Sequence, residues 1–174
     1  TGHMLFACVF HMRVVYAKFF CFKIYERAGK TRFTFASPFA PDQTQVIPKN
    51  GGNMQKRAKA YTLGGLILGG LFFALVLTFA LIFNKFFLWG ILPYAGYLVL
   101  LNIAPCYYES GKTDMLVYIG LKRGYDAEKT MLSAMEIQGR LYAGERFSDI
   151  ERKWFFDLPQ LAEDEPLYAV ILDL

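Results

Sequence analysis

Two apolar stretches decide the fold, YTLGGLILGGLFFALVLTFALIF at residues 61–83 and FFLWGILPYAGYLVLLNIA at residues 86–104. Lys85 is the only charged side chain from residue 61 to residue 108. A helix needs roughly 20 apolar residues to cross about 30 Å of hydrocarbon, and each stretch is close to that length. The sequence therefore predicts two transmembrane helices, joined as a hairpin by a tight turn at Asn84 and Lys85.

The overall composition agrees with a membrane protein. Of the 174 residues, 55% are hydrophobic and 20% are charged, against roughly 45 to 50% and about 25% in typical soluble domains. Residues 1–104 carry 11 Lys or Arg and 2 Asp or Glu, whereas residues 105–174 carry 8 and 13. This composition excludes intrinsic disorder, and the uneven charge lacks the basic stripe of a nucleic-acid-binding protein.

Basic residues flank the hairpin on both outer sides. Cytoplasmic loops of membrane proteins are enriched in Lys and Arg, so both flanks are predicted to be cytoplasmic and the turn at Lys85 to face outward. The flanking residues are Lys49, Lys56, Arg57 and Lys59 before the first stretch and Lys112, Lys122 and Arg123 after the second.

The segment before the hairpin divides into three parts. Met4–Tyr16 is apolar apart from a His and an Arg and is too short to span a membrane, so we interpret it as the second half of a membrane helix. Aromatic and β-branched residues in Phe19–Tyr25 and Thr31–Ser37 predict a β-hairpin. The prolines and glycines of residues 38–52 predict an irregular loop.

The segment after the hairpin has the pattern of water-soluble helices. Ala127–Tyr142 carries apolar residues near one face, with Asp126 as the expected N-cap and Gly144 as the stop. A second helix is expected over Asp149–Phe156, capped by Ser148. Pro166 opens a final apolar segment. We therefore expect a membrane-embedded domain at residues 1–110 and a cytosolic helical segment at residues 111–174, with both ends of the chain cut short.

Candidate metal chemistry lies at the first residues. Zinc proteases with an H-E-x-x-H motif place two His one helical turn apart, with the Glu beside the metal as general base. If His-Glu preceded Thr1, the chain would begin H-E-T-G-H and His3 would be the second ligand. Alternatively, Gly-His-Met is a cloning scar. On a continuous helix His11 would lie about 80° around from His3 and two turns away, so the two are not expected to share a metal.

Further motifs follow in a defined order. After the predicted strands and V-I-P-K at residues 46–49 come L-G-G at residues 63–65, N-I-A-P at residues 102–105 and then Asp114. With T-G-H at the start, this order resembles that of the site-2 protease (M50) family of intramembrane zinc metallopeptidases. The chain departs from the family's pattern at three positions. Many members have Pro and Asn where this chain has Leu66 and Gly69, and the Asp is usually followed by Gly, where this chain has Met115.

The resemblance implies specific roles. His3 and Asp114 would be zinc (Zn²⁺) ligands, and Asn102 and Pro105 would shape the substrate cleft. The other His and the Glu general base are expected just before Thr1, so no catalytic residue is expected in the 174 residues and this chain is predicted to be inactive by itself. An open alternative for Asp114 is an ordinary position at the start of a helix over Met115–Leu121.

We thus expect an α-helical polytopic membrane protein with a small β-hairpin and a cytosolic helical tail. The function implied by the resemblance is zinc-dependent hydrolysis of peptide bonds in membrane proteins, in a bacterial plasma membrane. Its partners would be membrane lipid and a membrane-protein substrate, and no nucleic acid is expected. The alternative is a non-catalytic membrane protein, either a degenerate relative of the proteases or a hairpin anchor for a helical interaction domain.

Overall fold

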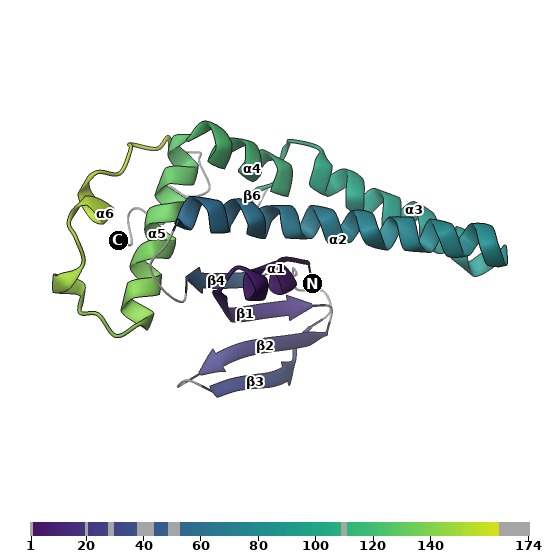
Figure 1. Ribbon diagram of the computed structural model, residues 1–174, viewed down its shortest axis with the longest axis horizontal. Coiled ribbons are helices and arrows are strands. Elements are labelled where there is room, and N and C mark those ends of the chain that lie inside the picture. The colour runs from purple at the N-terminus through teal and green to yellow at the C-terminus, as the bar shows by residue number, and fades with distance from the viewer. Residues whose placement is uncertain are drawn as a thin grey trace.

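The chain combines a long helical hairpin, a small antiparallel sheet and a helical C-terminal part. Figure 1 shows the sheet below the hairpin and the C-terminal helices at one end of it. The computed structural model describes residues 2–19, 21–27, 30–37, 44–48, 53–108 and 111–163. All statements on the structure below concern these ranges.

The hairpin consists of α2 (Met54–Phe83) and α3 (Phe86–Ile103). Asn84 adopts the left-handed conformation with φ 44° and ends α2, which confirms the predicted turn at residues 84 and 85. The helix begins seven residues before the expected start at residue 61, because the Asn53 side chain caps it by accepting a hydrogen bond from the Lys56 backbone N–H at 3.0 Å. Helix α3 ends at residue 103, one residue before the predicted end.

Both helices are long and apolar enough to cross a membrane. In their most apolar windows only 11% of the α2 residues and 6% of the α3 residues are buried. A helix in the core of a soluble protein would instead bury its apolar side chains. The exposed side chains include Phe72, Phe79, Phe86 and Tyr94.

A four-stranded antiparallel sheet follows the short helix α1 (Gly2–Val9). The strands lie in the order β3-β2-β1-β4. The β2–β3 pair is the β-hairpin predicted between residues 19 and 37, with Phe22 opposite Phe35 and Glu26 opposite Thr31. The strands are β1 (Met12–Phe19), β2 (Phe22–Arg27), β3 (Lys30–Phe35) and β4 (Thr44–Pro48).

Two expectations for the N-terminal segment are wrong. Met4–Tyr16 is not one helix: α1 ends at Val9, and His11 has a φ of 56°, which reverses the chain into β1. Strand β1 pairs with β2 on one side and with β4 on the other. Arg13 of β1 forms an ion pair with Glu26 of β2. Within the segment 38–52, where a loop was expected, residues 44–48 form strand β4, with Val46 and Ile47 buried where β4 pairs with β1. The rest of that segment lies outside the described residues.

The C-terminal part confirms one helix and corrects another. Helix α5 (Asp126–Tyr142) covers the predicted helix, but its N-cap is Tyr125 and Asp126 is its first residue. The expected helix over Asp149–Phe156 is split into a 3-10 helix, η1 (Phe147–Asp149), and a short α6 (Lys153–Phe156). Ser148 lies within η1 and donates to the Asp149 side chain instead of capping a helix. The final segment from Pro166 lies outside the described residues.

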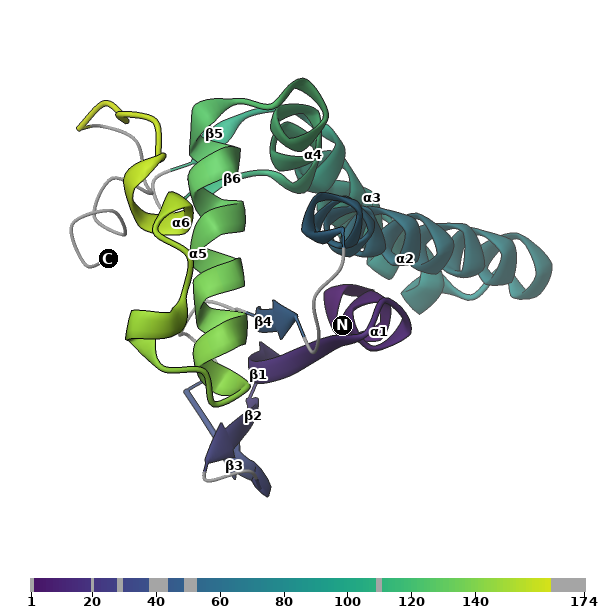
Figure 2. The same cartoon turned by 60° about the vertical axis from the view of Figure 1, so that its left-hand side comes forward.

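The C-terminal part packs on both the sheet and the hairpin. A short β5–β6 pair (Tyr107–Tyr108 and Gly111–Lys112) leads from α3 into α4 (Asp114–Arg123), which lies along α2. Helix α5 packs on β4, where a Cβ at Gly139 would lie 2.4 Å from the Pro48 side chain (Figure 2). Helices α1 and α4 both pack on α2, and their first turns lie close together there. The shared core contains Ala7, Met12, Val46 and Met54.

Candidate functional site

Helices α1 and α4 begin beside each other, and each contributes one titratable side chain. The His3 Nε2 atom lies 3.1 Å from Asp114 Oδ2. The two side chains are 24% and 20% exposed, so both are largely shielded from solvent. If both are ligands of one zinc ion, as the family resemblance implies, these atoms would lie within about 5 Å of each other. The structure brings them together at that distance, while their role as ligands stays a prediction.

The L-G-G motif of α2 makes this approach possible. A Cβ atom at Gly65 would lie 2.5 Å from both His3 Nε2 and Asp114 Oδ2. Next to this contact, Gly2 of α1 packs on Gly64 of α2. A Cβ atom added at Gly2 would lie 2.4 Å from the Gly64 carbonyl oxygen. Any larger residue at these positions would push α1 or α4 away from α2. The two glycines of α2 thus form the floor of the site.

The imidazole of His3 is oriented by a backbone carbonyl. His3 Nδ1 lies 2.9 Å from the carbonyl oxygen of Tyr61. A carbonyl oxygen accepts and cannot donate, so Nδ1 carries the hydrogen in this bond. In a neutral imidazole Nε2 then holds a lone pair that faces the Asp114 carboxylate. A proton on Nε2 or a metal cation is needed between these two acceptors.

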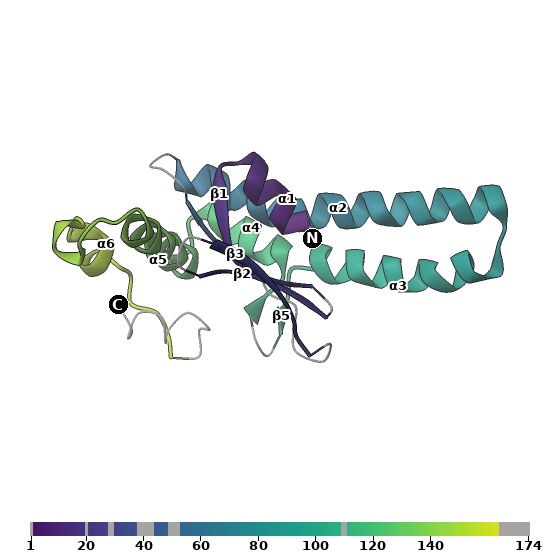
Figure 3. The same cartoon turned by 90° about the horizontal axis from the view of Figure 1, so that it is seen from below.

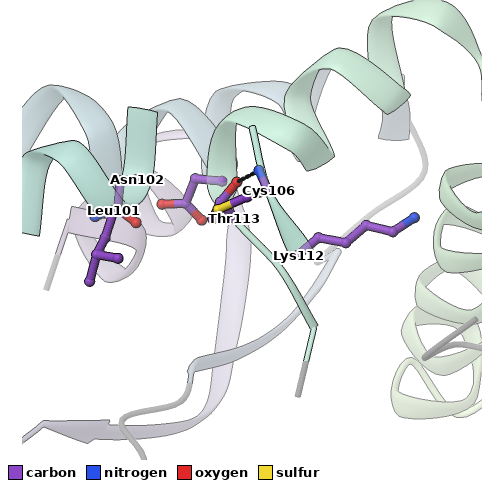
Figure 4. A pocket seen from close by; sticks show the side chains of 6 residues that line it. Leu101, Asn102, Cys106, Lys112 and Thr113 are labelled. Carbon is purple, nitrogen blue, oxygen red and sulfur yellow. Dashed lines mark hydrogen bonds between the residues drawn. The ribbon is translucent and has the colours of Figure 1, made fainter. Parts of the chain in front are cut away.

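Asp114 is the first residue of α4 and is positioned by Thr113. The Thr113 hydroxyl donates to the carbonyl oxygen of Ala104 at 2.6 Å and accepts from the Cys106 backbone N–H at 3.2 Å. Figure 4 shows this second bond beside the cavity that Asp114 lines. The residue occupies a helix start, as the alternative interpretation expects. However, Asp114 Oδ2 is buried, and among the described residues it accepts no hydrogen bond unless His3 Nε2, 3.1 Å away, carries a proton.

These features fit a zinc ligand pair. An imidazole nitrogen and a carboxylate oxygen are common zinc donors, and two ligands of one tetrahedral ion lie about 3.3 Å apart for bonds of about 2.0 Å. Zinc-binding histidines usually donate their other N–H to a carbonyl or carboxylate, as His3 does to Tyr61. A cation would also satisfy the buried Oδ2 atom of Asp114. Among the described residues, however, no group of three or more His, Cys, Asp or Glu side chains is placed to hold a metal ion.

Two cavities flank the pair, and Asn102 lines both. The larger has a volume of about 530 Å³ and lies between α1, α2 and α3, and the smaller has a volume of about 360 Å³. The Asn102 side-chain NH2 donates to the Leu98 carbonyl oxygen at 3.0 Å. The amide oxygen of Asn102 is an acceptor that this bond does not use. Residues lining the larger cavity are Gly2, His3, Gly65, Leu68, Gly69, Phe72, Leu98 and Asn102.

The other predicted residues lie farther out. Pro105 is exposed just after α3 and is not among the residues that line these two cavities. His11 is exposed beyond the end of α1, which ends at Val9. The angle of about 80° between His11 and His3, expected for one continuous helix, therefore does not describe their arrangement. Its separation from His3 arises because the chain has already turned into β1.

Sequence analysis missed a buried ion pair behind the site. Lys112 Nζ lies 3.1 Å from Glu128 Oε1, and these side chains are 10% and 4% exposed. Lys112 immediately precedes Thr113 and Asp114, whereas Glu128 belongs to α5. A Cβ at Gly120 of α4 would lie 2.4 Å from the Glu128 carboxyl group, so α4 and α5 are tightly packed here. No local pattern relates Lys112 to Glu128, which explains the omission.

We compared the chain with protein-family models, with curated proteins and with solved structures, and found no match. The resemblance to the site-2 protease family thus stays a prediction from short motifs.

Proposed function

We propose that this chain is part of an integral membrane zinc metalloprotease of the site-2 type, which hydrolyses peptide bonds of membrane proteins. The observation that carries the proposal is the contact between His3 Nε2 and Asp114 Oδ2 at 3.1 Å, over the Gly65 floor. Two short motifs far apart in the sequence meet there as the resemblance requires. An imidazole already oriented through its other nitrogen supports the same reading.

Each residue of the site has a distinct task in this proposal. His3 and Asp114 hold the zinc ion, the Tyr61 carbonyl fixes the His3 ring, and Thr113 fixes the start of α4 that carries Asp114. Asn102, at the junction of the cavities, is suited to hydrogen-bonding an extended backbone. A bound zinc ion supplies Lewis-acid activation of water and of a peptide carbonyl.

The third ligand and the general base are proposed to come from a His-Glu pair before Thr1. Residues four apart lie on the same helix face, one turn from each other. If α1 continues back by one turn, a His four residues before His3 would face the same floor. The Glu next to it would take the proton from the attacking water, a task that none of the site residues described here performs.

The membrane location is proposed from the hairpin. Helices α2 and α3 expose apolar side chains along most of their length, and Figure 3 shows their far half standing clear of every other element. Lipid is the environment that such a surface favours. We propose that the turn at Lys85 faces the outside and that the helices from α4 onward lie on the cytoplasmic side.

A second candidate is a non-catalytic membrane protein. A protonated His3 facing Asp114 would be an ordinary ion pair, and 3.1 Å suits that as well as it suits two metal ligands. In that case the hairpin anchors the sheet and α5 as a surface for other membrane proteins.

Metal binding and cleavage separate the two candidates. The chain extended upstream through the residues that precede Thr1 in its gene is expected to bind Co²⁺ with the visible absorption of a tetrahedral site and to cleave a membrane-spanning substrate. Asp114→Ala should abolish both, whereas His11→Ala should change neither because His11 lies outside the site. The 174-residue form should not cleave. Cleavage by that form, or full activity of extended Asp114→Ala, would refute the assignment.

A further inference from the structure

The larger cavity is an apolar chamber that opens beside His3. It lies at the root of the hairpin and is lined by residues of α1, α2 and α3. Figure 3 shows α1 packed against α2 in this region. The side chains of Leu68, Phe72 and Leu98 form its apolar wall, while the polar groups of His3 and Asn102 stand at the end next to Asp114. Among the described residues that line it, His3 is the one titratable side chain. The chamber is thus shaped for an apolar group whose attachment point lies near the His3–Asp114 pair.

We propose that this chamber receives one bulky apolar side chain, of the Leu or Phe class, from the membrane segment that is bound for cleavage. This inference rests on the proposed function and adds the substrate's side-chain class to it. The occupant is a polypeptide side chain because the chamber adjoins the pair where the scissile bond would lie. In an extended strand successive side chains point to opposite sides, so only alternate side chains reach it.

Gly69 keeps the chamber open. It lines the cavity one helical turn after Gly65, and a Cβ atom at this position would meet only Val99 Cγ2, at 3.8 Å. That distance is an ordinary van der Waals contact, so the first carbon of a larger side chain fits without moving the backbone. Because Gly69 lines the cavity, we expect the rest of the Leu side chain in Gly69→Leu to occupy the chamber.

The neighbouring glycine gives a matched control. A Cβ atom at Gly70 would have no atom within 4 Å, and Gly70 does not line the cavity. Gly69→Leu and Gly70→Leu add the same four carbon atoms to adjacent positions of one helix. Only the first should change what the chamber accepts, whereas both change helix propensity equally.

Photocrosslinking tests the chamber without cleavage. The 174-residue chain, with Phe72 replaced by p-benzoylphenylalanine, is placed in phospholipid nanodiscs with single-span peptides. The peptides share one Ala-rich frame and a central Pro, which breaks the helix and favours an extended conformation at the residue before it. One residue before the Pro is Phe, Leu, Ala or Ser. We expect crosslinking to be at least about tenfold stronger for Phe and Leu than for Ala and Ser, the range found for hydrophobic pockets. Gly69→Leu should abolish that preference, and Gly70→Leu should keep it.

Several results would overturn the inference. These are equal crosslinking of all four peptides, no crosslinking of any, an equal loss in Gly69→Leu and Gly70→Leu, or crosslinking to phospholipid chains in place of peptide. Zinc binding and cleavage by the upstream-extended chain test the proposed function separately. If the expected crosslinking pattern is found but the extended chain does not bind zinc, the protease proposal is refuted and the chamber is not. If the extended chain cleaves all four peptides equally, with or without Gly69→Leu, the chamber is refuted and the protease proposal is not.

Discussion

Replacing Gly65 with Ala is expected to force His3 and Asp114 apart. The added methyl carbon would lie 2.5 Å from His3 Nε2, 2.6 Å from His3 Cε1 and 2.5 Å from Asp114 Oδ2. Ordinary contacts begin at 3.4 Å, so these atoms would have to move by about 0.9 Å. Neither side has much freedom, because Tyr61 holds the imidazole and Thr113 ties the start of α4 to the end of α3.

The effect on metal binding should be large. Zinc–ligand distances tolerate about 0.2 Å, several times less than the displacement that the methyl group demands. Changes to groups that only support the ligands cost 10- to 100-fold in affinity, so a direct displacement of both ligands should weaken binding by at least about 100-fold. Overpacking should also destabilise the fold by about 1 to 3 kcal/mol.

Gly70→Ala is the control for this variant. Its methyl group would contact nothing within 4 Å, so only the gain in helix propensity, about 1 kcal/mol, is expected. The assay is competition for Zn²⁺ against a chromophoric chelator, with thermal unfolding in the same detergent, on the upstream-extended chain. Equal zinc affinity in Gly65→Ala and Gly70→Ala would show that the pair over Gly65 does not hold the metal.

Three further predictions concern topology and packing. In a background without native cysteines, Lys85→Cys is expected to react with an impermeant thiol reagent from outside the cell, because the turn is the far end of the hairpin; labelling only from the cytoplasm would contradict this topology. Glu128→Gln should lower the free energy of unfolding by about 3 kcal/mol, since it removes the charge that the buried Lys112 ammonium faces. As a control, Asp126→Asn at the exposed pair should lower the free energy of unfolding by less than about 0.5 kcal/mol, with both variants measured by denaturant titration. Equal losses in Glu128→Gln and Asp126→Asn would contradict the role of the buried pair. Thr113→Val should cost about 2 kcal/mol by removing two hydrogen bonds and should weaken zinc binding, whereas Thr113→Ser should keep both; a Val variant that behaves like the Ser variant would contradict this role.

The hairpin was predictable because its signal is local. The charge-free runs on either side of Lys85 and the turn at Asn84 can be read within a few tens of residues. The helix over residues 126–142 was found for the same reason, since its apolar spacing lies within one segment. In both cases only the bounds shifted, where caps such as Asn53 extended the helix.

The missed elements depend on contacts between distant residues. Strand β4 lies in a segment with a proline at its end, and Val46 and Ile47 are buried through elements distant in the sequence, by pairing with β1 and by the packing of α5 on β4. Likewise, the apolar residues after His11 fit either a helix or a strand until the partner strands are known. The closeness of His3 and Asp114 was expected from the family resemblance and not from any periodicity. The Tyr61 carbonyl, a backbone group, carries no sequence signal at all.

The lengths of α2 and α3 indicate how deep in a membrane the His3–Asp114 pair would lie. Helix α2 has 30 residues and α3 has 18, and both end at the same turn, so α2 extends beyond α3 by about 18 Å at the root of the hairpin. Gly65 lies 18 residues before Phe83, which places it about 27 Å from the turn along the helix axis. In a hydrocarbon layer of about 30 Å, the His3–Asp114 pair would sit just inside the boundary opposite the turn. Water and ions from that side would then need to cross only a few ångströms of lipid, and a segment cut there would be severed near one end of its membrane span.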